Sequence, residues 1–187
     1  DITLFEMARG KDFHKGTMIA ITGTNGKTST ATIIYEILKK EGFDVRLAGN
    51  IGKPILKLKK GNKKTIYIIE ISSFQLEIDT KLKPEIAVLL NISEDHLDRH
   101  SNMIEYRDIK SNIFKNQDKN DYSIISIDDK YSKYIADKNL KSKKILFTKS
   151  NLSVDVNLPY NLEAIEKVLE IFKIEKGVVR KRISELK

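Results

Sequence analysis

The sequence contains no cysteine and no tryptophan, and only three prolines, among its 187 residues. Without cysteine the protein has neither disulfides nor thiolate metal sites, which fits a reducing compartment. No apolar run approaches the roughly 18 residues that a membrane-spanning helix needs, and the N-terminus has no signal-peptide layout. The sequence therefore predicts a cytoplasmic protein without a membrane partner.

The formal net charge is +8, with 40% hydrophobic and 32% charged residues. A basic surface for nucleic acid is one interpretation, and lysines spread over a solvated surface are the other. Sequence-specific nucleic-acid readers use arginine and aromatic platforms, whereas lysine greatly outnumbers arginine here. We therefore expect no nucleic-acid partner, and we expect a monomer.

Short apolar runs alternate with helical patterns along the chain. We expect strands at 18–22, 45–49, 65–71, 86–92, 122–127 and 144–147, and helices at 28–40, 103–115, 130–138, 161–173 and 178–186. This alternation is typical of βαβ units. The predicted fold class is α/β, a three-layer domain of the P-loop type with a mostly parallel sheet flanked by helices. In such sheets ligands bind at the carboxyl ends of the strands.

A glycine-rich segment lies between the first predicted strand and the first predicted helix. Glycines allow a tight turn that brings backbone N–H groups to an anion, and a helix N-terminus adds partial positive charge. The generic motif has a glycine at the position that Ile21 occupies, so a simple glycine turn is the alternative. The predicted phosphate-binding residues are Gly23, Thr24, Asn25, Gly26, Lys27 and Thr28, with the Thr28 hydroxyl as a Mg²⁺ ligand.

Chemically active side chains follow the other predicted strands. Glu70 ends the third strand as a Mg²⁺ ligand or as a solvated carboxylate, and His96 follows the fourth as a metal ligand or a structural loop residue. Asn50 follows the second strand, where a substrate contact and an ordinary turn both fit. Lys110 lies within a helix, and by itself it is expected to be a solvated lysine.

Four sequence blocks resemble the central domain of the Mur ligases, and most closely the type that adds D-glutamate. These blocks are residues 21–28 (ITGTNGKT), 48–52 (AGNIG), 70–77 (EISSFQLE) and 91–98 (NISEDHLD). Folylpolyglutamate synthases share the first block, whereas the third points to the D-glutamate-adding type. The resemblance is weakest from 122 to 158, and it implies that residues 1–187 form one central ATP-binding domain.

The resemblance implies a role for each candidate residue. Lys27 and Thr28 would hold the phosphates of ATP and the first Mg²⁺, which Glu70 would share, and His96 would hold a second Mg²⁺. Lys110 matches a family lysine that is carbamylated into a metal ligand, which replaces the expectation of a solvated side chain. The predicted catalytic residues are therefore Lys27, His96 and Lys110.

Two further residues match binding positions of the family. Asn50 and Ser72 would face the UDP-muramoyl substrate. The family's His-Asn-x-x-Asn block beside adenine aligns with residues 157–161, where only Asn161 keeps the pattern. We therefore expect altered or weaker adenine binding through Asn161.

The implied reaction is ATP-dependent addition of D-glutamate to UDP-N-acetylmuramoyl-L-alanine through an acyl phosphate, in peptidoglycan precursor synthesis. The family's N-terminal uridine-nucleotide domain and C-terminal amino-acid domain have no counterpart here, so we expect an excised module that is inactive alone. The alternatives are another Mur ligase, a folylpolyglutamate synthase-like ligase, and a nucleotide-binding module without catalysis.

Overall fold

A computed structural model describes residues 16–50, 58, 61–78, 81–94, 102–149 and 161–186. Strands and helices alternate along these residues, as the sequence predicts. The strands are β1 (Thr17–Thr22), β2 (Val45–Gly49), β3 (Ile66–Glu70), β4 (Ile86–Leu89), β5 (Tyr122–Ser126) and β6 (Lys143–Phe147). The helices are α2 (Lys27–Lys40), α3 (Ser73–Ile78), α4 (Met103–Ser111), α5 (Lys130–Asp137), α6 (Leu162–Ile171) and α7 (Lys176–Ser184), with a 3-10 turn η2 (Asn112–Phe114).

The six described strands form one sheet in the order β2-β3-β1-β4-β5-β6. Every neighbouring pair is parallel, which confirms the predicted parallel sheet. The first strand in sequence lies inside the sheet, between β3 and β4. The segments that follow these three strands therefore meet at one edge.

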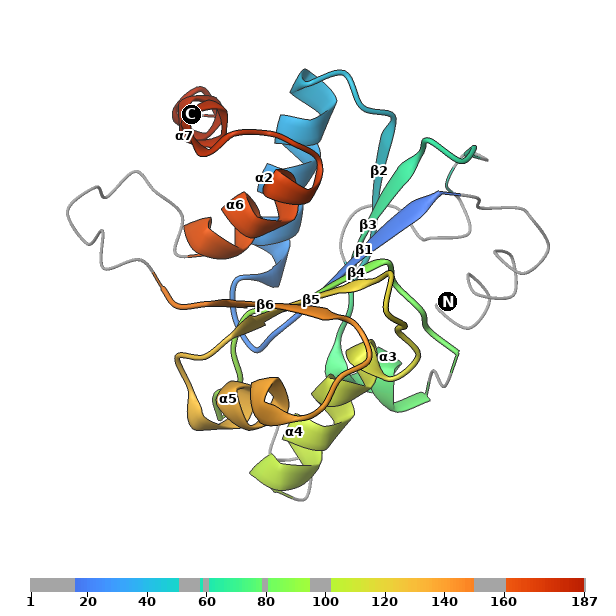
Figure 1. Cartoon of the computed structure of the whole chain (residues 1–187), viewed down its shortest axis with the longest axis vertical. Helices are drawn as coiled ribbons and strands as arrows, with labels where there is room; N and C mark the ends of the chain where they lie inside the picture. Colours follow the sequence, from blue (N-terminus) through green and yellow to red (C-terminus); the bar gives the residue numbers. More distant parts are fainter. Residues whose placement is uncertain are drawn as a thin grey trace.

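Helices cover both faces of the sheet, giving the predicted three layers (Figure 1). Helices α2, α6 and α7 lie on one face, and α3, α4 and α5 lie on the other (Figure 1). Each face has its own apolar core: Ile34 and Ile165 belong to the first, and Tyr106 and Ile135 belong to the second. Because both faces are covered, inner strands are apolar over most of their length.

The strands differ in composition according to their place in the sheet. All five residues of β3 are buried, whereas four of the five residues of the edge strand β6 are not fully buried. Lys143 and Lys144 stand exposed at the start of β6. Charged side chains on an edge strand discourage pairing with another chain.

Two differences from the sequence prediction stand out, beside shifted bounds such as those of α4, which ends at Ser111, and α7, which begins at Lys176. Helix α3 was not predicted, because six residues are too few for a clear helical repeat. The fourth strand ends at Leu89 rather than Ile92, because the chain leaves the ladder to form loop contacts that start at Asn91.

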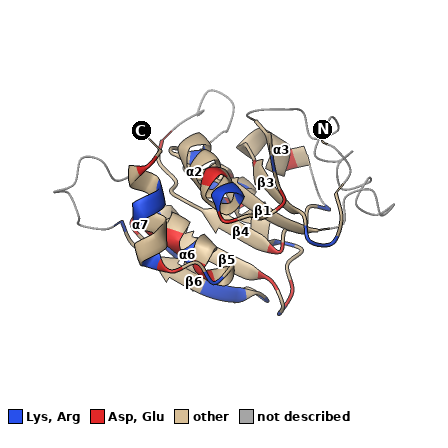
Figure 2. Cartoon of the chain, turned by 90° about the horizontal axis from the view of Figure 1, so that it is seen from above, with Lys and Arg blue, Asp and Glu red and all other residues tan. Residues whose placement is uncertain are grey.

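Basic side chains occur on α7 and on β6 (Figure 2). On α7, Arg180 and Lys176 pair with the buried carboxylate of Glu166, at 2.9 and 3.3 Å. Arg182 pairs with Glu41 at 2.8 Å. Much of the positive charge of α7 is therefore paired within the protein. Within the described ranges, no helix is both long and apolar enough to cross a bilayer.

Candidate functional site

The loops after β1, β3 and β4 converge at the carboxyl edge of the sheet. Ile21 of β1 is in register with Glu70 of β3, and Thr22 is in register with Leu89 of β4. The glycine-rich loop therefore begins beside Glu70 and beside the start of the loop that contains Asn91. The sequence prediction that these strand ends share one edge is confirmed for the described residues.

The loop enters α2 through Gly26, which has a φ of 82°. This left-handed conformation favours glycine. The first helical bond runs from the Thr30 N–H to the Gly26 carbonyl, so the N–H groups of residues 26–29 have no carbonyl partner within the helix. No side chain caps this helix end. These four N–H groups are suited to an anion.

The carbonyl groups of the loop, by contrast, all accept hydrogen bonds. The Lys27 ammonium donates to the carbonyls of Gly23 (2.9 Å) and Thr24 (2.8 Å), and the Lys110 ammonium donates to Gly23 (3.1 Å). The Asn91 amide donates to the carbonyl of Asn25 at 3.0 Å.

The last loop carbonyl, that of Gly26, accepts from both the N–H and the hydroxyl of Thr30. Donors therefore occupy the carbonyls of residues 23–26, while the N–H groups of residues 26–29 remain for a ligand. We call this arrangement, with occupied carbonyl groups and available N–H groups, the separated polarity of the loop. It suits a phosphate group.

Glu70 lies at the centre of the strand edge and is 1% exposed, so the alternative of a solvated carboxylate is wrong. Its two oxygens accept from the Thr28 hydroxyl at 2.8 Å and from the Asn50 amide at 3.2 Å. Both donors are neutral, and within the described ranges no ion pair is formed by Glu70. A buried carboxylate beside a hydroxyl at a helix N-terminus is a suitable oxygen donor set for Mg²⁺.

Lys110 is 1% exposed on α4, so the expectation of a solvated lysine from sequence alone is wrong. Its ammonium lies 4.5 Å from the centre of the Tyr106 ring and reaches Gly23 of the phosphate loop. The Tyr106 hydroxyl is 3.4 Å from the Thr24 hydroxyl. Helix α4 therefore contacts the loop through both of these side chains.

Asn161 precedes α6 and lies directly over Gly26. Its amide donates to the Thr30 hydroxyl at 3.2 Å, and a Cβ at Gly26 would come within 2.1 Å of the amide nitrogen. The Asn161 side-chain oxygen is buried and has no hydrogen-bond partner in the described part of the chain. The structure thus brings Asn161 to the loop, and its contact with adenine stays a prediction.

Ser72 has a structural role that the sequence prediction missed. Its hydroxyl accepts from the Gln75 N–H at 3.3 Å, while the Gln75 side-chain oxygen accepts from the Ser72 N–H at 2.9 Å. This is a capping box, and the Ser-x-x-Gln spacing was its available signal. A contact between Ser72 and a substrate stays a prediction.

His96 lies outside the described residues, so its metal role also stays a prediction. Among the residues that are described, no three His, Asp or Glu side chains gather as a metal-binding group. Mg²⁺ commonly uses one or two carboxylates together with waters and phosphate oxygens. The pair formed by Glu70 and Thr28 is consistent with that mode.

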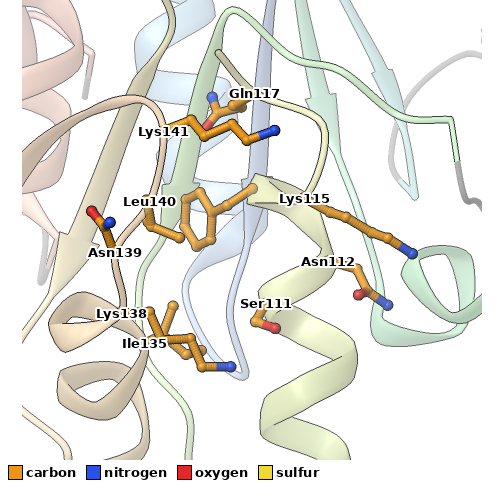
Figure 3. A pocket seen from close by; sticks show the side chains of 10 residues that line it. Ser111, Asn112, Lys115, Gln117, Ile135, Lys138, Asn139, Leu140 and Lys141 are labelled. Atoms are coloured by element: carbon orange, nitrogen blue, oxygen red, sulfur yellow. The ribbon is translucent and has the colours of Figure 1, made fainter. Parts of the chain in front are cut away.

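A pocket of about 380 Å³ lies elsewhere, at the ends of α4 and α5 (Figure 3). Gln117, one of its lining residues, donates to the Pro84 carbonyl just before β4. The pocket is therefore at the amino edge of the sheet, opposite the phosphate loop. Lys115, Lys138 and Lys141 line it, but it shares no residue with the candidate site.

Comparison with known proteins agrees with this geometry. Residues 21–183 match the family model described as the Mur ligase middle domain. The chain belongs to the Mur ligase family. The matched range includes the phosphate loop, Glu70, Lys110 and Asn161.

Three similar relatives carry the name UDP-N-acetylmuramoylalanine–D-glutamate ligase. The chain is 45% identical to the protein of Citrifermentans bemidjiense (69% of this chain, 31% of the relative). It is 50% identical to that of Geobacter metallireducens (60% and 25%) and 45% identical to that of Geobacillus kaustophilus (74% and 31%). The chain therefore spans about a third of these relatives' length or less.

Solved structures of Mur ligases share the fold. The UDP-N-acetylmuramate:L-alanyl-gamma-D-glutamyl-meso-diaminopimelate ligase of Neisseria meningitides superposes with a TM-score of 0.76 at 13% identity, over 98% of this chain and 70% of that one. The MurF ligase of Thermotoga maritima, solved with ADP, gives 0.61 at 24% identity, over 80% and 36%. At these identities the likeness concerns the fold alone.

Sequence reasoning assigned no role to Asn91 and Tyr106. Asn91 lies at the carboxyl end of the predicted strand 86–92, and that position was an available signal. Tyr106 gave no signal beyond an aromatic residue four positions before Lys110 on a helix.

Proposed function

We propose that this chain binds Mg-ATP at the loop between β1 and α2, as the nucleotide-binding domain of a ligase. The observation that carries the proposal is the separated polarity of the loop. Donors satisfy the carbonyls of residues 23–26, and the N–H groups of residues 26–29 precede the first helical bond. An array of unpartnered N–H groups at a helix N-terminus favours a phosphate.

Lys27 and Thr28 act next to this array. The half-buried Lys27 ammonium, held on the loop by two carbonyls, would exchange them for phosphate oxygens. Thr28 and Glu70 would hold the Mg²⁺ that accompanies the triphosphate. When bound, ATP supplies the phosphoryl group. The Mg²⁺ ion neutralises the negative charge that develops while this group is transferred.

Lys110 and His96 would complete a second Mg²⁺ site. Carbamylation would join the Lys110 nitrogen to carbon dioxide with release of two protons, one from the ammonium and one as the carbamate forms, which would convert a buried cation into an anionic ligand. The position beside the loop supports this role, since a ligand here would lie close to the phosphates.

Asn161 would contact the adenine side of the nucleotide. Its buried oxygen has no partner among the described residues and is an acceptor for the amino group of adenine. Because an unsatisfied buried acceptor costs about 1–3 kcal/mol, this hydrogen bond would favour binding. Because only Asn161 keeps the pattern of the His-Asn-x-x-Asn block, adenine binding would be altered or weaker than in relatives with the full block.

The parent reaction would join D-glutamate to UDP-N-acetylmuramoyl-L-alanine in cytoplasmic peptidoglycan precursor synthesis. The substrate carboxylate takes the γ-phosphoryl group and gives an acyl phosphate and ADP. The amine of D-glutamate then displaces phosphate and loses a proton, forming the amide. Asn50, hydrogen-bonded to Glu70, and Ser72 would face the UDP-muramoyl substrate. The relatives named for this reaction at 45–50% identity support this assignment.

The chain alone, acting as a monomer, would bind the nucleotide without completing the reaction, because it spans about a third of its relatives. Calorimetric titration with Mg-ATP tests the binding. Lys27→Met should weaken it at least 10-fold, whereas Lys133→Met, an exposed lysine on α5, should leave it unchanged. Absence of binding by the unaltered chain would overturn the proposal.

The amino-acid substrate requires a second experiment, with a chain that includes the remaining parts found in the relatives. Phosphate release that depends on D-glutamate and UDP-N-acetylmuramoyl-L-alanine is the expected result. Release with meso-diaminopimelate or with a folate instead would assign a different ligase. Nucleotide binding without phosphate release, whichever of these substrates is supplied, would indicate a non-catalytic module.

A further inference from the structure

Asn91 makes three hydrogen bonds to the phosphate loop. Its main-chain carbonyl accepts from the Thr24 N–H at 3.0 Å. Its side-chain oxygen accepts from the Asn25 N–H at 2.9 Å, and its side-chain nitrogen donates to the Asn25 carbonyl at 3.0 Å. The side chain thus pairs with both polar groups of one loop residue. Asn91 is 8% exposed, so its side of these bonds is shielded from water.

These bonds divide the N–H groups of the loop into two sets. The N–H groups of Thr24 and Asn25 point to Asn91 and are unavailable to a ligand. Those of residues 26–29 lie beyond the region that Asn91 contacts and have no partner within the helix. The bond to the Asn25 carbonyl also keeps that negative end away from a bound anion.

We propose that Asn91 is a positioning residue, which determines the N–H groups of the loop that face the phosphates. The proposal rests on the nucleotide binding proposed above. Asn91 itself does not touch the nucleotide and acts through the orientation of the peptide groups on either side of Asn25.

The chemistry of the contact requires asparagine. A short side chain must supply one acceptor and one donor at once, about 3 Å from the same residue. Aspartate would place a second acceptor against the Asn25 carbonyl, and leucine would supply neither group. Aspartate leaves the Asn25 carbonyl without its donor, and leucine leaves both main-chain groups of Asn25 without partners, which frees the peptide to rotate.

Asn91→Leu tests the proposal by its effect on Mg-ATP affinity. Loss of two hydrogen bonds, each contributing about 1 kcal/mol, predicts an affinity roughly 10- to 30-fold weaker. The matched control is Asn116→Leu, because the Asn116 amide also donates to a loop carbonyl, that of Leu82 at 2.9 Å, at the opposite edge of the sheet. The control should bind as the unaltered chain does, although its thermal stability falls. Equal affinities for Asn91→Leu and the unaltered chain would overturn the proposal.

Amide NMR of the unaltered chain gives a test that needs no variant. Without nucleotide, the Asn25 amide should exchange slowly with solvent. With Mg-ATP, the amides of residues 26–29 should shift strongly, while the Asn25 amide stays protected. Fast exchange of Asn25 without nucleotide, or its loss of protection on binding, would overturn the role of Asn91 alone. If Mg-ATP causes neither amide shifts in the NMR titration nor heat in the calorimetric titration, the nucleotide proposal is overturned as well.

Discussion

Glu70→Gln should separate stability from ligand binding at the strand edge. Glu70 is 1% exposed and accepts hydrogen bonds only from neutral groups, Thr28 and Asn50, within the described ranges. A buried carboxylate without a paired cation carries a desolvation cost. Glutamine has the same shape: its oxygen can accept from Asn50, and its amide can donate to the Thr28 hydroxyl. The variant without ligand should therefore be as stable as the unaltered chain, or more stable by about 1–2 kcal/mol.

The same change should remove the gain from Mg-ATP. A ligand at 100 times its dissociation constant raises the free energy of unfolding by about 2.7 kcal/mol. If loss of the charged metal ligand in Glu70→Gln weakens Mg-ATP binding about 100-fold, the same ligand concentration raises the free energy of unfolding by only about 0.4 kcal/mol. For a chain of this size, these gains correspond to about 5–11 °C and about 1–2 °C in Tm.

Thermal unfolding, monitored by circular dichroism with and without Mg-ATP, measures both effects. Glu175→Gln, at an exposed position before α7, is the control and should keep the full ligand-induced rise. Chelation of Mg²⁺ should reduce the rise of the unaltered chain to that of Glu70→Gln. The reasoning is refuted if the variant keeps the full rise, or if it is destabilised by more than about 2 kcal/mol without ligand.

Three other results are expected. Gly26→Ala should lower the free energy of unfolding in urea by about 1–3 kcal/mol, because φ is 82° and the new Cβ meets the Asn161 amide. Adding Asn161→Ala should recover part of this loss. If the losses of the two single variants simply add in the double variant, the contact is not the cause. Arg180→Ala should destabilise the chain more than Glu166→Gln, because only Arg180→Ala leaves the fully buried Glu166 carboxylate without its arginine partner. A larger loss of unfolding free energy in urea for Glu166→Gln would contradict this. A hydrogen bond from a threonine hydroxyl lowers the pKa of Asp44. The stabilisation that this bond provides is present above the unfolded-state pKa and is lost as pH falls through the lower folded-state pKa. The difference in unfolding free energy between the unaltered chain and Asp44→Asn, below about 1 kcal/mol at this partly exposed site, should therefore disappear in acid.

Much of the fold follows from the sequence because its signals are local. The apolar run of β3 and the repeat of Ile34, Ile37 and Leu38 on α2 each define one element. Helix α3 is too short for such a repeat, and its start was missed although Ser72 and Gln75 form a capping pair. The strand order depends on pairings between distant segments, which no local pattern contains.

The site was partly predictable for the same reason. The phosphate loop directly follows a strand and Glu70 ends one, so the rule of carboxyl strand ends finds them. The burial of Lys110 could not be read from its helix, because it results from the approach of α4 to the loop after β1. The contacts of Asn91 were also hidden, since they join residues 66 positions apart.

The central place of β1 has a consequence for how the chain folds. Both of its neighbours come later in the sequence, since Thr17 pairs with Ile66 and Ile19 pairs with Ile86. During synthesis, β1 must wait for both partners with its edges unpaired. Such long-range pairings slow folding and expose intermediates to aggregation. The newly made chain would therefore acquire its ligand-ready loop only at a late, cooperative step.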